Sequence, residues 1–383
     1  MTPKEIRTPT QEERDVSRRR KFWALAAAGV LATSGLAACG DDDDDGGEGG
    51  SGGGDSGGTP KVGVLLPDSQ SSVRWETVDR PFLQKAFEAA GVDADIQNAE
   101  GDKSTQQQQA EQMITNGAKV LLLVNLDSGS GATIVSNAKA QNAKVIDYDR
   151  LTLEADSDYY VSFDNEAVGK LQGEGLVKCI EDRRLDTPNI AVLNGSPTDN
   201  NAKLFKNGYD SVINPKFESG EWKEVDDQSV PDWDNQQALT IFEQMLEKSN
   251  NEIDGVLAAN DGLGQAAISA LKSRKVENVP VTGQDATTEG VQNVLAGDQC
   301  MTVYKAIKKE ADAASELAVA LAKGETPSTA TDSINNGKKD VPSVLLEPVA
   351  VTKDNVADTV IKDGFRTKEE LCVGRFKADC EGL

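Results

Sequence analysis

Short apolar runs alternate with amphipathic, helix-like segments along the chain from Pro60 onward. The run 118–125 is almost continuously apolar, which is typical of a strand in a parallel sheet that is covered on both faces. Gly91 stands where a helix should end, and Ser104 stands where the next helix should have its N-cap. The first half is therefore predicted to alternate strands at 61–67, 93–99, 118–125 and 144–149 with helices at 78–91, 104–117 and 130–142.

The same alternation continues through the second half of the chain. Strands are predicted at 159–164, 189–195, 221–227, 255–260, 279–285 and 301–305. Helices are predicted to begin at Glu166, Asn201, Asp234, Asp261 and Thr288. Repeated βα units of this length predict a doubly wound α/β architecture with right-handed crossovers. Because the strands are too many for one small sheet, we expect two similar lobes.

Polar side chains follow many of the predicted strands, at 148–150, 163–165, 258–261, 283–285 and 303–305. In open parallel sheets, ligands bind beyond the carboxyl ends of the strands. For any single position the alternative is a helix cap, since Asp and Asn often cap the helix that follows a strand. The recurrence favours a shared ligand site at one edge of each lobe.

The N-terminus has the layout of a secretory signal, with basic residues at 18–21 and an uncharged run from Phe22 to Ala38. The stretch 19–22 loosely fits a twin-arginine signal, but Trp23 stands where Leu is usual, so the export route stays open. Residues 36–39 resemble the lipobox of bacterial lipoproteins, in which Cys39 would be acylated. The alternative is a chance cysteine behind an ordinary signal peptide.

Composition excludes several function classes. The chain has 40 basic and 64 acidic residues, a net charge of −24, which argues against nucleic-acid binding. It has no histidine, so it lacks the commonest general base and zinc ligand. It has no nucleotide-binding glycine motif, and the Asp run 41–45 lacks calcium-loop spacing and reads as part of a solvated tether. We expect neither a cofactor nor a metal.

Four cysteines follow Cys39, an even number that suggests two disulfides in an exported chain. Cys372 and Cys380 are close in sequence and are predicted to pair, which leaves Cys179 and Cys300 as the other pair by elimination. None of them has the CxxC spacing of a metal or redox site, so structural roles are expected.

The side chains at the strand ends, together with Trp75 and Trp233 in loops, suit a sugar. Planar amide, carboxylate and guanidinium groups match vicinal hydroxyls, and flat aromatic rings match the apolar faces of a pyranose. At these residues the chain resembles the ribose/galactose-type sugar-binding proteins of bacterial ABC transporters, and within them the D-xylose-binding branch. The resemblance covers roughly residues 61–370 and rests most specifically on "FDNEAVG" (163–169) and "GSPTDNNAKLF" (195–205).

The resemblance implies the type I periplasmic binding fold, in which two Rossmann-like lobes are joined by a three-segment hinge with the ligand between them. The N-terminal lobe would comprise 61–165 plus 305–341, and the C-terminal lobe 166–304 plus 342–383. They would follow a signal peptide over 1–38 and a lipidated Asp/Gly/Ser tether over 39–60.

The resemblance also implies a ligand-binding set. The set comprises Arg74, Trp75, Asp149 and Arg150 from the first lobe, and Asp199, Asn201 and Trp233 from the second lobe. Asn260, Asp285 and Lys305 complete the polar groups around the ligand. Trp233 has hydrophobic packing as its alternative role, and Lys305 a hinge ion pair. Val73 departs from the charged residue expected before the Arg-Trp pair, which could change the sugar that fits, and the tail 372–380 lies outside the family pattern.

The implied function is that of a monomeric solute-binding lipoprotein, held by Cys39 at the outer face of the cytoplasmic membrane. It would bind a monosaccharide, D-xylose first, and deliver it to an ABC permease by hinge closure, without enzymatic activity. Another pentose or hexose, a signalling receptor with the same cleft, and a tethered carbohydrate hydrolase are the alternatives.

Overall fold

The computed structural model describes residues 61–383. The predicted signal peptide, the predicted acylation site Cys39 and the predicted tether up to residue 60 lie outside the described residues. Within 61–383, no helix is both long enough and apolar enough to cross a membrane.

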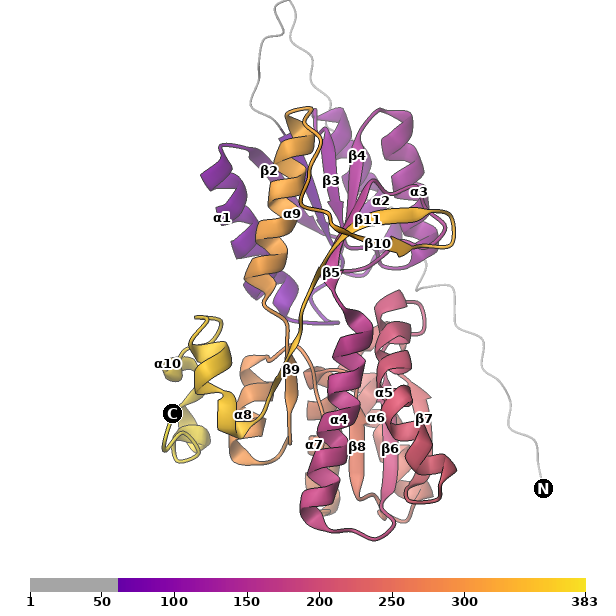
Figure 1. Cartoon of the computed structure of the whole chain (residues 1–383), viewed down its shortest axis with the longest axis vertical. Helices are drawn as coiled ribbons and strands as arrows, with labels where there is room; N and C mark the ends of the chain where they lie inside the picture. Colours follow the sequence, from indigo (N-terminus) through magenta and orange to yellow (C-terminus); the bar gives the residue numbers. More distant parts are fainter. Residues whose placement is uncertain (1–60) are drawn as a thin grey trace, which may run out of the picture. The chain divides into compact units, whose positions relative to one another are not determined.

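The first lobe is built on a sheet with the strand order β10-β11-β5-β4-β3-β1-β2, in which all neighbours are parallel except β10 and β11 (Figure 1). The strands are β1 (Lys61–Leu66), β2 (Asp93–Asn98), β3 (Val120–Leu123), β4 (Lys144–Tyr148), β5 (Tyr159–Phe163), β10 (Asp332–Asn335) and β11 (Asp340–Leu346).

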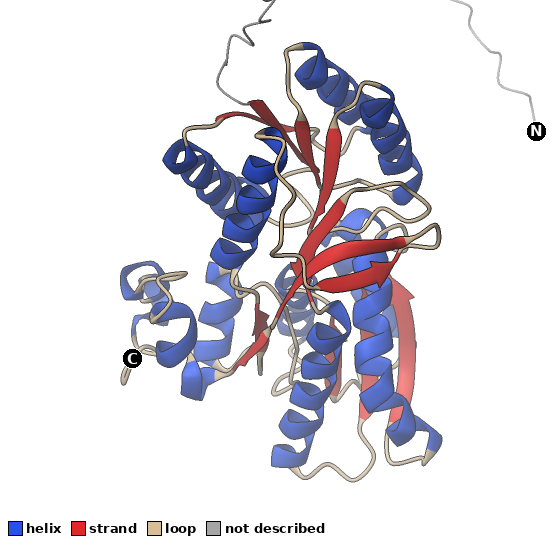
Figure 2. Ribbon diagram, turned by 45° about the horizontal axis from the view of Figure 1, so that its top comes forward, coloured by secondary structure: helices blue, strands red, loops and turns tan. Residues whose placement is uncertain are grey.

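Helices cover both faces of this sheet (Figure 2). They are α1 (Arg80–Ala90), which follows the short η2 (Trp75–Asp79), then α2 (Lys103–Thr115), α3 (Ser128–Ala140) and α9 (Ile307–Ala322). On β3, Leu122 packs in one core with residues of α1 and α9, whereas Leu121 packs in another core with residues of α2 and α3. The continuous apolar run therefore arises because both faces of the strand are buried.

The second lobe has the parallel strands β7-β6-β8 and a small antiparallel pair, β9 and β12. The strands are β6 (Asn189–Asn194), β7 (Lys223–Ser229), β8 (Gly255–Ala258), β9 (Thr302–Tyr304) and β12 (Val349–Val351). The helices are α4 (Asn165–Arg183), α5 (Asn200–Glu218), α6 (Asn235–Lys248), α7 (Asp261–Arg274), α8 (Thr288–Ala296) and α10 (Lys368–Leu371). Short turns η3 (Pro231–Trp233), η4 (Lys353–Asn355), η5 (Ala357–Ile361) and η6 (Gly374–Lys377) complete the fold.

The doubly wound α/β prediction is confirmed, but two local predictions are wrong. The segment 279–285 forms no strand but only an isolated parallel bridge between Val256 and Val281, and its last residue, Asp285, has a positive φ of 94°. The N-cap of α2 is Asp102 and not Ser104: its carboxylate accepts the Thr105 N–H at 2.6 Å, so the helix starts earlier.

The chain crosses between the lobes from β5 to α4, from β9 to α9, and from β11 to β12. The last crossing falls later than the expected boundary after residue 341. β11 runs through Leu346 and pairs with β5, so these residues complete the first sheet before the chain enters β12.

Two disulfides join Cys179 to Cys300 and Cys372 to Cys380. The first links α4 to the loop before β9. The second closes the C-terminal tail, whose Leu371 is fully buried in the core of the second lobe. In Figure 1 this tail, in yellow, lies beside α8.

α4 and α5 pack so closely that only glycine fits at their contact. A Cβ atom on Gly169 would overlap the carbonyl oxygen of Phe205, and one on Gly208 would overlap that of Glu166. Both helices begin at the lobe boundary, so the spacing between them sets the position of the first turn of α5, which carries Asn201 of the cavity.

We predict that Gly169→Ala lowers the free energy of unfolding by about 1–3 kcal/mol, because the added methyl group forces the two helices apart. Urea unfolding monitored by circular dichroism measures the loss. Glu174→Ala, at an exposed position of the same helix, is the control and should change stability little. A Gly169→Ala protein as stable as the control would contradict the close-packing argument.

Candidate functional site

The structure brings all the predicted site residues to one narrow cavity between the lobes. It is lined by Arg74, Trp75, Asp149, Arg150, Asp199, Asn201, Trp233, Asn260, Asp285 and Lys305. Ser71, Ser72, Phe205 and Gln284 also line it and were missed. Phe205 belongs to the stretch 195–205 that carries the family resemblance, and Gln284 to the polar strand end 283–285, so those stretches could have indicated them. Nothing in the local sequence marks the two serines.

Asp149 lies at the centre of the site, in the loop after β4, with a positive φ of 61°. Its carboxylate accepts Arg74 Nη1–H at 2.8 Å from its own lobe. From the other lobe, Asn201 Nδ2 donates to its Oδ1 at 3.0 Å and to its carbonyl oxygen at 2.9 Å. Burial by itself would raise the pKa of Asp149, but attraction to Arg74, Lys305 and Arg150 outweighs it and lowers the pKa to about 2.

Arg74 is occupied largely by carboxylates. Its Nε and Nη2 donate to Asp79 at 2.9 and 2.8 Å, and Nη2 also donates to Glu310 at 3.0 Å. Burial, together with repulsion from Asp149, raises the pKa of Glu310 well above its usual range. The guanidinium therefore contributes to the cavity chiefly by fixing Asp149, although it was expected to donate to ligand hydroxyls.

Trp75 forms part of the cavity wall and is only 3% exposed. Its Nε1–H donates to Ser71 Oγ at 3.1 Å. The guanidinium carbons of Arg74 and Arg150 lie 4.3 and 5.6 Å from its ring centroid, within cation–π distance. These contacts hold the indole at the wall. Val73, by contrast, is 57% exposed and does not line the cavity, so it has no contact through which to select a sugar.

Trp233 enters the cavity from the second lobe on a strained turn. Asp232 and Trp233 have φ values of 53° and 56°, which are rare for residues other than glycine. The indole Nε1–H donates to Asp199 Oδ2 at 3.0 Å, and the ring packs edge-on against Phe205. A Cβ atom on Gly195 would overlap the indole, so a glycine is required beneath it.

Several site residues also cap helices or form ion pairs, the roles that are the alternatives to ligand binding. Asn260 Oδ1 accepts the Leu263 N–H at 2.9 Å and caps α7, and Asp199 Oδ1 accepts the Asn201 N–H at 2.9 Å. Lys305 pairs with Asp285 at 3.1 Å and lies 3.7 Å from Asp149, as a hinge ion pair would. Capping leaves the amide nitrogen of Asn260 for the cavity, whereas the second oxygen of Asp199 already accepts Trp233 Nε1–H at 3.0 Å and pairs with Arg150 at 3.1 Å.

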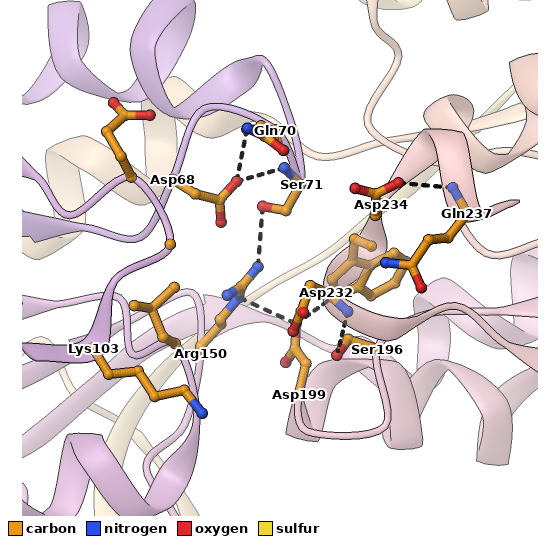
Figure 3. A pocket seen from close by; sticks show the side chains of 14 residues that line it. Asp68, Gln70, Ser71, Lys103, Arg150, Ser196, Asp199, Asp232, Asp234 and Gln237 are labelled. Atoms are coloured by element: carbon orange, nitrogen blue, oxygen red, sulfur yellow. Dashed lines mark hydrogen bonds and ion pairs between the residues drawn. The ribbon is translucent and has the colours of Figure 1, made fainter. Parts of the chain in front are cut away.

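The cleft widens outward from the inner cavity into a polar hollow (Figure 3). Arg150 stands between the two spaces, since its Nε pairs across the lobes with Asp199 Oδ2 at 3.1 Å and its Nη2 reaches Ser71 Oγ at 3.5 Å. The rim carries Asp68, Gln70, Lys103, Asp232, Asp234 and Gln237 from both lobes. The site thus combines a buried polar end with an opening to solvent.

The arrangement suits a small polyhydroxylated ligand. The inner cavity is lined by both donors and acceptors, and two indole rings form part of its wall. Within residues 61–383, no cluster of three or more acidic, cysteine or histidine side chains is placed to hold a metal ion.

Comparisons with known proteins agree with this geometry. Residues 62–326 match the family model described as periplasmic binding protein domain. The chain is similar to the D-xylose-binding periplasmic protein of Escherichia coli, with 42% identity over 312 residues that cover 81% of this chain and 92% of the relative. It is 36% identical to a multiple sugar-binding periplasmic protein of Azospirillum brasilense, over 82% of this chain and 91% of that one.

Among solved structures, the chain resembles a carbohydrate transporter solute-binding protein from Chloroflexus aurantiacus in complex with D-glucose. The TM-score is 0.76 and the identity 31%, with 82% of this chain and 98% of the other chain covered.

Asp261 supports the loop that carries Asp285, and it supplies a pH-dependent term in stability. Its carboxylate is buried and accepts Thr287 N–H at 2.8 Å, Gln299 Nε2–H at 2.8 Å and Thr302 Oγ1–H at 2.8 Å. Burial raises its pKa from 3.8 to about 6, although these hydrogen bonds lower it in part. At pH values between about 4 and about 6, the Asp261 carboxyl is therefore protonated to a greater extent in the folded state than in the unfolded state.

We predict that the free energy of unfolding falls as the pH rises from about 4 to about 6, in part because Asp261 must ionise while buried. Asp261→Asn cannot titrate, so its stability should fall less over this window, whatever its absolute value. Urea unfolding at several pH values measures both slopes. Asp147, whose pKa burial also raises to about 6, contributes equally to the two proteins and cancels in the comparison. Equal slopes would contradict the assignment.

Proposed function

On the premise that the chain belongs to the periplasmic binding protein family, as an extracytoplasmic sugar-binding component of an ABC transporter and not an enzyme, we propose that its ligand is D-xylose. The observation that carries the proposal is the convergence of the residues expected from the D-xylose-binding branch on one inter-lobe cavity. The 42% identity to a D-xylose-binding protein supports the choice of sugar.

We propose that the sugar hydroxyls bind between Asp149, Asn201, Asp285 and Lys305, with indole rings against the sugar. Each of these polar groups already has a partner in the structure, at distances from 2.8 to 3.7 Å. The hydroxyls of a pyranose therefore have to replace these existing contacts. Each replacement needs a hydroxyl in the right position, so affinity depends on hydroxyl stereochemistry.

Closure of the cleft would transmit binding to the permease. Direct contacts already join the lobes, such as Asn201 with Asp149 and Arg150 with Asp199. A sugar that contacts both lobes gains more from the closed form than from the open form, and so shifts the population toward closure. The permease would then recognise the closed form and accept the cargo.

The test is titration calorimetry of the chain from residue 39 onward, with Cys39→Ser to prevent acylation. The sugars are D-xylose, D-glucose, D-ribose, L-arabinose and D-galactose. We expect one-to-one binding of D-xylose, micromolar or tighter. Tighter binding of another sugar, such as the D-glucose found in the Chloroflexus aurantiacus structure, would keep the cleft and change the ligand. A folded protein that binds none of them would refute the proposal.

The same titrations test the site itself. We expect Trp233→Ala and Asp285→Ala each to weaken binding at least tenfold, roughly 1.4 kcal/mol, while the proteins stay folded. Trp233→Ala removes a stacking surface, and Asp285→Ala removes an acceptor from the cavity. Asp186→Ala, at an exposed position before β6, is the matched control. Wild-type affinity in both site variants would contradict the site.

We further propose that Cys39 is acylated and that the acidic Gly/Ser stretch after it tethers the binding protein beside its permease. In cells fed a labelled fatty acid, the wild-type protein should carry the label and sediment with membranes. Cys39→Ser should carry no label and leave the membrane fraction. Label that persists in Cys39→Ser, or a wild-type protein free of label, would contradict acylation at this cysteine.

A further inference from the structure

The loop that presents Asp285 to the cavity is held in a conformation that its residues do not favour. Asp285 and Ala286 are consecutive and have φ values of 94° and 45°. Such conformations persist in residues other than glycine only where the surrounding contacts determine them. The position of the Asp285 carboxylate therefore depends on whatever holds this pair of residues.

The N–H groups of the pair are held from within the lobe. Asp285 N–H donates to the carbonyl oxygen of Val303 at 2.9 Å, and Ala286 N–H donates to Thr302 Oγ1 at 3.2 Å. Both acceptors belong to β9, the strand that leads directly to Lys305. The next peptide, between Ala286 and Thr287, is held on its N–H side by Asp261, which accepts Thr287 N–H at 2.8 Å, and on its carbonyl side by a further residue.

That carbonyl is held by a residue far along the chain. Arg366, in the segment before α10, donates from Nε to the Ala286 carbonyl oxygen at 2.9 Å. Its guanidinium lies 4.1 Å from the ring centroid of Phe365, and Nη1 donates to the Phe365 carbonyl oxygen at 3.2 Å. Arg366 is half-buried, and burial lowers its pKa in spite of the nearby carboxylates of Glu370, Asp261 and Asp285.

The same segment also contacts the neighbour of Lys305. The ring of Phe365 lies 4.9 Å from that of Tyr304, and Tyr304 OH donates to Asp363 Oδ2 at 3.3 Å. Residues 363–366 thus touch the residue after Asp285 and the residue before Lys305. Those two site residues pair with each other at 3.1 Å inside the cavity.

The C-terminal tail anchors the segment in turn. Gln292 of α8 donates from Nε2 to the carbonyl oxygens of Glu370 and Leu371, at 3.2 and 3.1 Å. The Cys372–Cys380 disulfide follows at once, and Leu371 is fully buried. The tail that lay outside the expected family pattern is therefore continuous with the support of the binding cavity.

We infer that Arg366 is a positioning residue for the sugar site: by holding the Ala286 carbonyl, it sets the strained loop that aims the Asp285 carboxylate at the ligand. This inference rests on the proposed sugar-binding function. Arg366 does not line the cavity, so its effect on affinity passes through Asp285 and not through contact with the sugar.

The test compares variants of the chain from residue 39 onward by calorimetry, with whichever of the five sugars the wild type binds most tightly. Arg366→Gln should weaken binding about tenfold or more, whereas Arg366→Lys, which keeps a donor on a long side chain, should restore most of the affinity. Arg375→Gln is the matched control from the same tail. Arg375 lies 3.8 Å from Asp298 at an exposed site and should not matter.

A double-mutant cycle separates positioning from general destabilisation. If Arg366 acts through Asp285, Arg366→Gln should change affinity less than about threefold in an Asp285→Asn background. Equal losses in both backgrounds, or wild-type affinity in Arg366→Gln, would overturn the inference. If Arg366→Gln does not fold, Arg366→Met, which keeps a long side chain without a donor, carries the same cycle. A wild type that binds no sugar would instead refute the proposed function.

Discussion

Asp149 is a buried carboxylate contacted by Arg74 from the first lobe, by Asn201 from the second, and by Lys305 where the chain passes between them. A buried carboxylate without partners is costly, because it loses its water and gains nothing in return. The groups that satisfy Asp149 come from both sides of the cleft. Attraction to Arg74, Lys305 and Arg150 outweighs burial and lowers the pKa of Asp149, and approach of the lobes adds the hydrogen bonds from Asn201.

Further charged side chains hold Arg74, the partner of Asp149, in place. Arg74 donates hydrogen bonds to Asp79 and Glu310 as well as to Asp149, and Tyr148 OH donates to Asp79 at 2.7 Å. Burial raises the pKa of Glu310, and repulsion from Asp149 and Asp79 adds to this rise against the attraction of Arg74. A site of this kind is preorganised, since its side chains are fixed by one another before a ligand arrives.

Backbone strain gathers at the same place. Asp149, Trp233 and Asp285 all have positive φ, and none of them is glycine. Such strain is tolerated where surrounding contacts over-determine the backbone, and it is common where side chains must be aimed at a ligand. Here the supports are a glycine beneath Trp233, the β9 and Arg366 contacts around Asp285, and Tyr160 OH, which donates to the Asp149 carbonyl at 3.0 Å.

The sequence by itself determined the alternation of strands and helices and the division into two lobes, which follow from local periodicity. Polar residues at strand ends indicated a site at one edge of each lobe, because parallel strands bring their carboxyl ends to one edge. The full ligand-binding set came from the resemblance to the sugar-binding family. Only the tertiary structure decided that 279–285 pairs through a single bridge, that β11 stays in the first sheet to Leu346, and that Arg74 binds carboxylates. It alone brought Arg366 to Ala286. Each of these depends on contacts between residues far apart in the chain, which no local pattern encodes.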